Sequence, residues 1–266
     1  MTDQDELAER FAAEGAVVVR GALDHDELAL AVDGIEAAIA RPGERTIVAS
    51  RDDDPGWFVE DFRCAERVPA LARLARSWSL GALAARLMGS DSVRFHHDHV
   101  LVKRAGTRQA TPWHQDQPYY DVDGRQTVSF WIPVDRVPEA ASLEVALGSH
   151  RGPWYLPRTF LDEQARWFPE GSLAEVPDME ADPPPYPTRR WALEPGDLVA
   201  FHMATLHRAG PASSGDDRRV VSLRYVGDDA VHAPRAWTTS PDFGDVAHDL
   251  VAGGALDHPL FPVVWP

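Results

Sequence analysis

The hydrophobic and polar positions at the start of the chain predict a helix, a strand and a second helix. The stretch "DELAERFAAE" carries apolar residues at helical spacing and is broken at Gly15. The β-branched run "AVVV" follows, and a helical pattern returns from about Asp24. We therefore expect helix, strand and helix as the entry to the fold.

From residue 92 onwards the pattern changes to short apolar or alternating runs separated by Gly, Pro and Asp. These runs include "FHHDHVLVK", "TVSFWIPVD", "SLEVALG", "GDLVAFHM" and "RVVSLRYV". Such spacing is typical of antiparallel strands in a sandwich or barrel. The pattern predicts a mainly β fold with flanking α-helices.

Residues 152–190 interrupt the strand pattern with a Pro-rich irregular insertion that contains "PDMEADPPPYPTRR". A segment of this length is a lid, a pocket wall or a loop that only covers the sheet. The tail "DHPLFPVVWP" predicts an extended C-terminal strap. At 266 residues, the chain fits a single domain, 1–266, that includes both features.

Composition and charge narrow the classes of partner. The formal charge of −16 would repel a phosphate backbone, so we expect neither nucleic acid nor an anionic membrane as a partner. No apolar run approaches the roughly 18 residues of a membrane span. The acidic start "MTDQDELAERF" does not resemble a signal peptide, which predicts a cytoplasmic protein. The single cysteine excludes an intrachain disulfide and a cysteine-based zinc site. Oligomeric state stays open.

The stretch "WHQDQPYY" places His114 and Asp116 two residues apart. On a strand these side chains would project to the same side, where they could bind one metal ion. A lone His-x-Asp is weak evidence, and a third ligand must come from elsewhere. The histidines that remain after surface and loop positions are set aside are His96, His97, His99, His202 and His207.

His207 lies near a strand end in "PGDLVAFHMATLHRAGP", and Arg218 opens the next strand, "RVVSLRY". A histidine followed by an arginine on the next strand could hold a metal and, beside it, a carboxylate. These motifs carry a family resemblance. In the order "WHQD", "FWIPVD", "LGSHR", "PGDLVAFHMATLHRAGP" and "RRVVSLRY", the chain resembles the phytanoyl-CoA dioxygenase-like branch of the Fe(II)/2-oxoglutarate-dependent oxygenases over most of its length.

The resemblance implies a double-stranded β-helix, the jelly roll or cupin-like fold, with His114, Asp116 and His207 as iron ligands. The implied cofactor is Fe(II), with 2-oxoglutarate and O2 as cosubstrates. Two imidazoles and one carboxylate on one face of the ion leave coordination positions open for 2-oxoglutarate and O2. Related halogenases have a small residue in place of the aspartate, so Asp116 favours hydroxylation.

The resemblance also implies the binding residues for 2-oxoglutarate. Arg218 would hold the far carboxylate through its planar fork, and Trp131 and Leu101 would pack against the cosubstrate. Arg219 is a competitor, but neighbours on a strand face opposite sides, so only one of the two can serve. Some relatives have a Ser or Thr that makes a second contact with 2-oxoglutarate. This chain has Ala209 at that position, so it lacks a counterpart of that contact.

Residues that we expect in the substrate pocket are His97 and His99, on the same strand face as Leu101, and Tyr119 and Tyr120, directly after the metal motif. Core histidines satisfied within the fold are the alternative for His97 and His99. The sequence thus predicts a dioxygenase that hydroxylates a small polar metabolite and releases succinate and CO2. The alternatives are a zinc-dependent hydrolase, since the same ligands bind zinc, and a non-catalytic jelly-roll binding protein.

Overall fold

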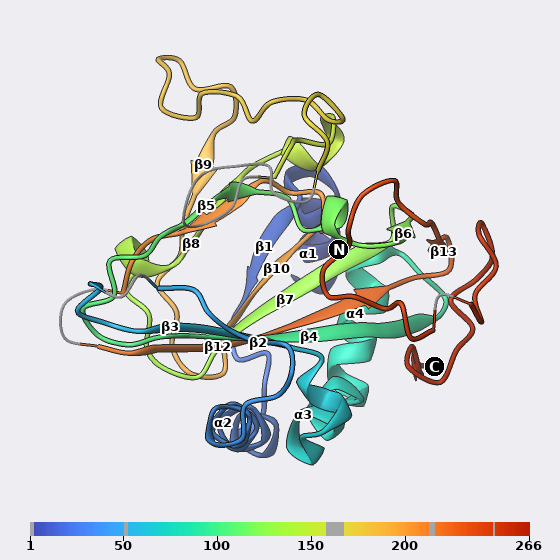
Figure 1. Ribbon diagram of the computed structural model, residues 1–266, viewed down its shortest axis with the longest axis horizontal. Coiled ribbons are helices and arrows are strands. Elements are labelled where there is room, and N and C mark those ends of the chain that lie inside the picture. Colours follow the sequence, from blue (N-terminus) through green and yellow to red (C-terminus); the bar gives the residue numbers. More distant parts are fainter. Residues whose placement is uncertain (1–2, 51–52, 158–167, 213–215, 247) are drawn as a thin grey trace.

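Two antiparallel sheets face one another in the computed structural model, and helices cover the outer side of the larger sheet (Figure 1). The structure describes residues 3–50, 53–157, 168–212, 216–246 and 248–266. The α-helices are α1 (Asp3–Glu14), α2 (His25–Ala40), α3 (Pro69–Ala75) and α4 (Trp78–Met88). The short 3-10 helices are η1 (Cys64–Glu66), η2 (Gln117–Tyr119), η3 (Glu139–Ala141) and η4 (Ser149–Arg151).

The larger sheet has the order β1-β10-β7-β12-β4-β3-β2, and β14 also pairs with β4. Its strands are β1 (Ala16–Val19), β10 (Leu198–Phe201), β7 (Thr127–Pro133), β12 (Arg218–Val226), β4 (Val93–Lys103), β3 (Phe58–Phe62), β2 (Thr46–Val48) and β14 (Val263–Trp265). The smaller sheet consists of β5 (Thr111–His114), β11 (His207–Ala209), β8 (Leu143–Ala146) and β9 (Thr188–Arg189). The pair β6 (Val122–Asp123) and β13 (Val231–His232) stands apart. The predicted mainly β fold with flanking helices, a double-stranded β-helix, is confirmed.

The predicted entry of helix, strand and helix is also confirmed, as α1, β1 and α2. Gly15 ends α1 at φ 79°, where a Cβ atom would lie 2.3 Å from the ring of His150, so only glycine fits. Asp24 caps α2, because its side chain accepts from the backbone N–H of Glu27 while the Glu27 side chain accepts from that of Asp24. Local sequence chemistry therefore sets both boundaries.

Strand alternation divides the larger sheet into two faces. On the outer face, Val100, Phe130 and Leu223 are buried against the helices, which contribute Ile35 and Leu71. The inner face carries a second apolar cluster, made up of Trp131, Val199, Phe201 and Val220 together with Leu143 and Val145 of the smaller sheet. Between the two sheets this inner face also holds polar side chains, and the candidate site lies there.

The irregular insertion and the C-terminal strap both contact the body of the fold. Tyr155 and Leu156 of the insertion are buried, and residues 158–167 lie outside the described part of the chain. The end of the strap forms β14, in which Val263 pairs with Arg94 of β4. Within the described ranges, no helix is long and apolar enough to cross a membrane.

An aromatic cluster under the C-terminal segment encloses His96, a residue of β4. The ring of His96 stacks on Phe261 at 5.2 Å and lies 5.1 Å from Phe243. Burial, followed by the charge of Arg224, lowers the pKa of His96 to about 3. Burial likewise lowers the pKa of His202 to about 4. Both imidazoles are therefore neutral at neutral pH.

We expect acid to destabilise the fold through these histidines. Their folded-state pKa values lie below the ordinary value of 6.5, so as the pH falls below that value only the unfolded chain takes up the protons. The free energy of unfolding should fall by about 1 kcal/mol per pH unit or more between about pH 6 and pH 4. Urea unfolding across this range measures the slope. His96→Phe, which keeps the ring packing, should flatten it, and His25→Gln on the surface should not; an unchanged slope in His96→Phe would contradict the assignment.

Candidate metal and cosubstrate site

His114, Asp116 and His207 converge at one end of the smaller sheet. His114 is the last residue of β5 and pairs directly with His207, the first residue of β11. The Nε2 atoms of His114 and His207 lie 3.8 and 3.7 Å from Oδ1 of Asp116. One ligand atom from each residue lies within 4.8 Å of the others. This spacing allows one ion to contact all three.

Asp116 reaches this point by a turn, so the expectation that it shares a strand with His114 is wrong. Strand β5 ends at His114, and Asp116 has helical backbone angles, φ −74° and ψ −45°, immediately before η2. The backbone N–H groups of Asp116 and Gln117 both donate to the carbonyl of Met203, each at 2.9 Å. These bonds turn the chain after Gln115, and the turn, rather than strand alternation, brings the carboxylate back to the imidazoles.

Hydrogen bonds fix the orientation of both imidazoles. Nδ1 of His114 lies 2.9 Å from the carbonyl of Pro112, and Nδ1 of His207 lies 2.9 Å from the carbonyl of Thr205. In each case Nδ1 donates to the carbonyl two residues earlier, which directs Nε2 toward Asp116. Burial, then the neighbouring His114, lowers the pKa of His207 to about 3. His207 is therefore neutral, as a metal ligand must be.

A serine and an arginine hold the carboxylate of Asp116. Oδ2 accepts from Ser129 Oγ at 3.0 Å and from the guanidinium of Arg224 at 3.1 Å, which leaves Oδ1 toward the imidazoles. Burial by itself would raise the pKa of Asp116, but Arg224, followed by His207 and His114, lowers it to about 2. Asp116 is therefore ionised, with one oxygen committed to the protein and the other facing the ligand position.

The donor set fits a non-haem Fe(II) ion. Two imidazoles and one ionised carboxylate, all largely buried, match the ligands of a facial triad, which leaves room for further ligands. The role of Arg224 was not predicted from the sequence. Strand alternation could have indicated it, because every second residue of β12 from Arg218 onwards lies on the same face, and Arg224 is one of them.

Next to the triad, a cavity of about 340 Å³ lies between the two sheets. Of the predicted binding residues, those that line it are Leu101, Trp131, His99, Tyr119 and Tyr120. His97 lies outside the lining, with its ring edge to face against Tyr120 at 4.7 Å. Pro157 and Phe168, the described residues on either side of 158–167, also line the cavity. The insertion therefore forms part of the pocket wall.

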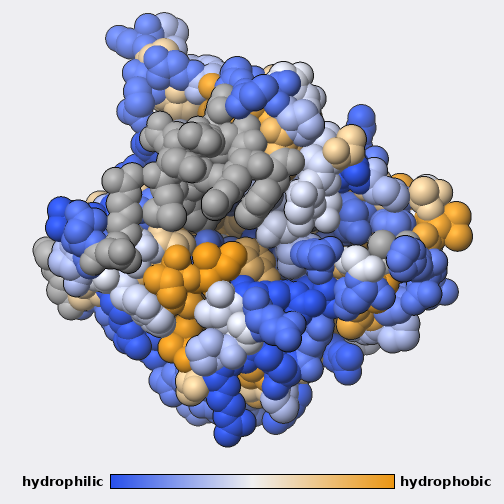
Figure 2. Space-filling view, in the orientation of Figure 1, coloured by the Kyte–Doolittle hydropathy of each residue, from blue (hydrophilic) through white to orange (hydrophobic). Residues whose placement is uncertain are grey.

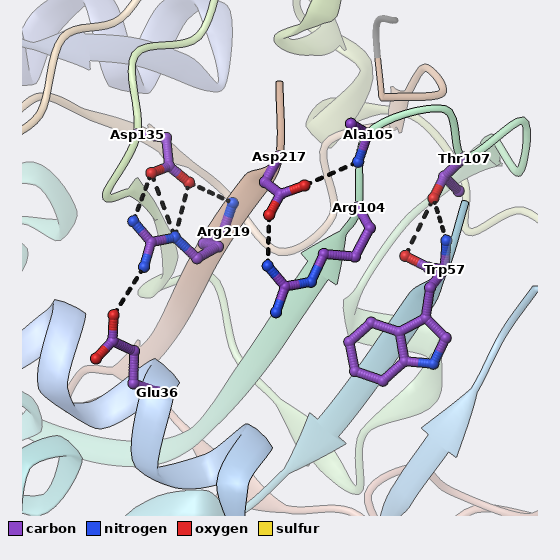
Figure 3. Close-up of polar contacts among 8 residues, drawn as sticks. All are labelled: Glu36, Trp57, Arg104, Ala105, Thr107, Asp135, Asp217 and Arg219. Carbon is purple, nitrogen blue, oxygen red and sulfur yellow. Dashed lines mark hydrogen bonds and ion pairs between the residues drawn. The ribbon is translucent and has the colours of Figure 1, made fainter. Parts of the chain in front are cut away.

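The two candidate arginines face opposite sides of β12. The guanidinium of Arg219 is paired with Asp135 at 2.7 Å and with Glu36 of α2 at 3.1 Å on the outer face (Figure 3). Figure 3 also shows the neighbouring pair of Arg104 and Asp217 at the same end of the sheet. With its charge already balanced on the far side of the sheet, Arg219 is not directed toward the cavity.

Arg218 lies on the inner face, on the same side as the lining residues Ser222 and Arg224. It is 6% exposed and donates to the carbonyls of Ala141 and Gly210, while no carboxylate of the described chain lies within ion-pair distance. Burial lowers the pKa of Arg218 to about 10, so the guanidinium remains charged at neutral pH. It does not itself line the cavity but lies behind it, at the end of the barrel.

Lys103 is a second buried cation at this end of the barrel. It pairs with Arg218 across β4 and β12, and its Nζ donates to the carbonyls of Gln109 and Gly210 at 2.8 and 3.2 Å. Burial, then Arg218, lowers the pKa of Lys103 well below its usual value. Within the described ranges Lys103, like Arg218, has no ion-pair partner, so this end of the barrel favours an anion.

The remaining candidate histidines serve the fold. His202 accepts from the backbone N–H of Ala204, and its Nε2 lies 2.8 Å from the carbonyl of Arg125. Gln115, between the two ligands of the motif, is fully buried and faces away from them. Its amide donates to the carbonyl of Ala204 and accepts from the backbone N–H of Tyr155. It therefore fixes both the loop before His207 and the start of the insertion.

A comparison with protein families finds that a model described as phytanoyl-CoA dioxygenase (PhyH) matches residues 11–220. A search among curated proteins gives no match. Solved structures with a similar fold include the non-haem α-ketoglutarate-dependent epimerase SnoN from nogalamycin biosynthesis. Its TM-score is 0.74 and its identity 23%, over 99% of this chain and 98% of SnoN.

Two other solved structures extend this likeness. The non-haem α-ketoglutarate-dependent carbocyclase SnoK from nogalamycin biosynthesis has a TM-score of 0.75 and 20% identity, over 99% of this chain and 96% of SnoK. EctD from S. alaskensis, solved with 2-oxoglutarate and 5-hydroxyectoine, has a TM-score of 0.62 and 21% identity, over 85% of this chain and 76% of EctD. At these identities the likeness establishes a shared fold.

We expect Ser129→Ala to weaken metal binding about tenfold, because Asp116 would lose one of the two groups that fix Oδ2. Ser222→Ala is a matched control, since this buried hydroxyl also lines the cavity but has no hydrogen-bond partner within the described ranges. Titration of the apoprotein with Fe(II) or Co(II) under anaerobic conditions measures both affinities. Equal affinities in the two variants would show that Ser129 does not position the ligand.

Proposed function

This chain belongs to the phytanoyl-CoA dioxygenase family, a branch of the Fe(II)- and 2-oxoglutarate-dependent oxygenases, and on that premise we propose that it hydroxylates a small-molecule substrate at the cavity between its two sheets. As a member of this family it is a non-haem iron enzyme that uses 2-oxoglutarate. We propose His114, Asp116 and His207 as the residues that hold the iron. The observation that carries the proposal is the buried triad, in which hydrogen bonds turn each of these side chains toward one common point.

When bound, the iron supplies O2 activation coupled to the oxidative decarboxylation of 2-oxoglutarate, with succinate and CO2 as products. The contribution of the protein is to keep the ligands in the right ionisation state and position. Arg224 and Ser129 compensate the charge of Asp116, so the carboxylate stays ionised in a buried site. The backbone carbonyls of Pro112 and Thr205 keep the two imidazoles oriented.

We propose Arg218 as the anchor for the far carboxylate of 2-oxoglutarate. Among the described residues the buried guanidinium bonds to carbonyls alone, which leaves its charge available to an anionic ligand, and its fork of N–H donors matches a carboxylate. Trp131 and Leu101 supply the apolar walls for the carbon chain. Thr111 is the cross-strand partner of Ala209 and lines the cavity, so its hydroxyl is our candidate for the polar contact that Ala209 cannot make.

The substrate side of the cavity is proposed to lie at His99, Tyr119 and Tyr120. Tyr119 contacts the ring of His114 edge to face at 6.3 Å, so a molecule packed on Tyr119 lies close to the metal ligands. The cavity has the size of an ordinary small-molecule site, about 300 Å³ or more, and the acidic chain disfavours a coenzyme A thioester with its phosphates. Holding one C–H bond toward the iron then selects the position that is oxidised.

The direct test loads the protein with Fe(II) and 2-oxoglutarate without oxygen. We expect the visible charge-transfer band of the chelate, and we expect succinate once O2 is admitted. His114→Ala and Asp116→Ala should lose iron and therefore the band. If the iron-loaded, folded protein gave neither band nor succinate, the oxygenase proposal would be wrong, and a hydrolase or a binding protein would remain.

Arg218→Ala should weaken 2-oxoglutarate binding about 100-fold without loss of iron, because a buried charge-assisted pair is removed. Arg219→Ala is the matched control, since it removes the same side chain from the opposite face. It should lower the free energy of unfolding but leave 2-oxoglutarate affinity within about twofold. Titration of the chelate band measures both affinities, and the reverse result would assign the anchor to Arg219.

A further inference from the structure

Glu60 is an acidic side chain in the cavity that the proposed chemistry does not use. It is the central residue of β3 and faces inward, with 5% of its surface exposed, and it lines the cavity. Its cross-strand partners are Leu101 of β4 and Ile47 of β2. Glu60 thus lies at the cosubstrate wall on one side and at the edge of the sheet on the other.

The contacts of Glu60 within the described chain compensate its charge only in part. Nε2 of His99 lies 3.3 Å from Oε1, and Lys103, opposite Phe58 on the neighbouring strand, is influenced by the charge of Glu60 but lies beyond ion-pair distance. Burial lowers the pKa of His99 and outweighs the opposite effect of Glu60, so the imidazole is neutral at neutral pH. No Arg or Lys of the described chain lies within ion-pair distance of Glu60, whereas the buried Asp61 and Asp116 have Arg67 and Arg224.

A buried carboxylate without a cation is unfavourable, because it has lost its hydration and gained no opposite charge. The imidazole of His99, beside Glu60, is nevertheless held in place by packing. His99 is stacked on Phe62 with ring centroids 3.9 Å apart and an interplanar angle of 18°, so the imidazole cannot turn away. Nε2 of His99 faces Oε1 of Glu60 at 3.3 Å, and no other polar partner of Nε2 is present in the described residues. The Glu60 carboxylate can therefore still pair with a cation that enters through the cavity.

The unpaired charges of the cavity separate into two sites. At the closed end Arg218 has no ion-paired carboxylate among the described residues, and the proposed 2-oxoglutarate supplies one. Glu60 has no ion-paired Arg or Lys in that part of the chain, and neither 2-oxoglutarate nor the proposed iron ligands supply a partner for it. Tyr119 links the two regions, because it lines the same cavity as Glu60 and its ring contacts that of His114 edge to face at 6.3 Å.

An apolar surface lies beside Glu60 at the mouth of the cavity. Ile47, directly opposite Glu60 on β2, is 45% exposed, and Val48 is 57% exposed, yet both line the cavity. Figure 2 shows an apolar patch over β2 on this face of the molecule. On the other wall, Phe168 packs edge to face on Tyr119 at 5.5 Å. The mouth therefore offers apolar contact to a ligand whose polar end reaches Glu60.

We propose that the substrate is an amphiphilic amine: its protonated nitrogen pairs with Glu60 beside His99, and its apolar part lies between β2 and Phe168. This inference rests on the proposed function, because it describes the occupant of the same cavity. It refines the small polar metabolite expected from the acidic composition by assigning the polar group a positive charge and adding an apolar portion. Glu60 is then a specificity-determining residue that holds the carbon chain near the metal ligands.

The test uses three probes that share a phenethyl group and differ in the end group attached to it: phenethylamine, phenethyl alcohol and 3-phenylpropionate. Each is titrated calorimetrically into the protein loaded anaerobically with Fe(II) and 2-oxoglutarate, after the chelate band has been recorded. Absence of the band would be a failure of the proposed function and is thereby separated from this inference. With the band present, we expect the amine to bind at least about tenfold more tightly than the alcohol, and phenylpropionate to bind most weakly.

Glu60→Gln keeps the size and hydrogen bonding of the side chain and removes its charge. It should retain the chelate band and bring the amine and the alcohol to within about twofold of each other. Glu44→Gln, at an exposed position, is the matched control and should keep the preference for the amine. An amine preference that persists in Glu60→Gln would overturn the proposal, as would equal binding, or no binding, of amine and alcohol to the chelate-forming protein.

A separate variant tests the apolar contact between the ligand and β2. Ile47→Asn, at a half-exposed rim position, should weaken the amine and the alcohol equally, by about fivefold, and leave their ratio unchanged. Unchanged affinity for both probes would show that the apolar part does not lie along β2.

Discussion

The clamp on Asp116 is the interaction on which the site depends. A carboxylate buried between two imidazoles has lost its hydration, and without compensation it would take up a proton and cease to be a good ligand. Arg224 and Ser129 provide that compensation from β12 and β7, the two central strands of the larger sheet. Because both groups bind the same oxygen, they also decide which oxygen faces the metal position. The smaller sheet carries the two proposed imidazole ligands, and the larger sheet keeps the carboxylate of Asp116 ionised and oriented.

Charges on the inner face of the larger sheet are separated across its strands. Arg218 of β12 and Lys103 of β4 lie opposite one another without an ion-paired carboxylate in the described part of the chain, whereas Glu60 lies on β3, next to Ile47 of the edge strand β2. Arg224, farther along β12, is neutralised by Asp116. This order places the cations on the central strands and an acidic, partly apolar entrance at the edge strands. Such an arrangement separates an anionic cosubstrate from a cationic substrate by charge alone, before any detail of shape contributes. On the outer face, Arg219 is balanced by Asp135 and Glu36.

Several features were predictable because they depend on local chemistry. Asp24 and Gly15 set the helix boundaries, and the alternating runs predicted the strands. The site was predictable in part: His114, Asp116 and His207 were named through the order of motifs, and they do converge. The geometry assumed for Asp116 was wrong, because its turn depends on the carbonyl of Met203, far along the chain. Glu60 was missed, because nothing near it in the sequence shows that it lies in the cavity without an ion-paired Arg or Lys in the described chain.

The sequence by itself determined the elements, the division of each strand into two faces and the identities of the groups that can bind a metal. These follow from hydrophobic periodicity and side-chain chemistry, which act over a few residues. Only the tertiary structure decided which charges are paired. Arg218 and Arg219 are neighbours with identical chemistry, yet one is balanced by Asp135 and Glu36 and the other by no carboxylate of the described chain. Pairing depends on residues that lie about 80 to 180 positions apart in sequence and meet only when the sheet has closed.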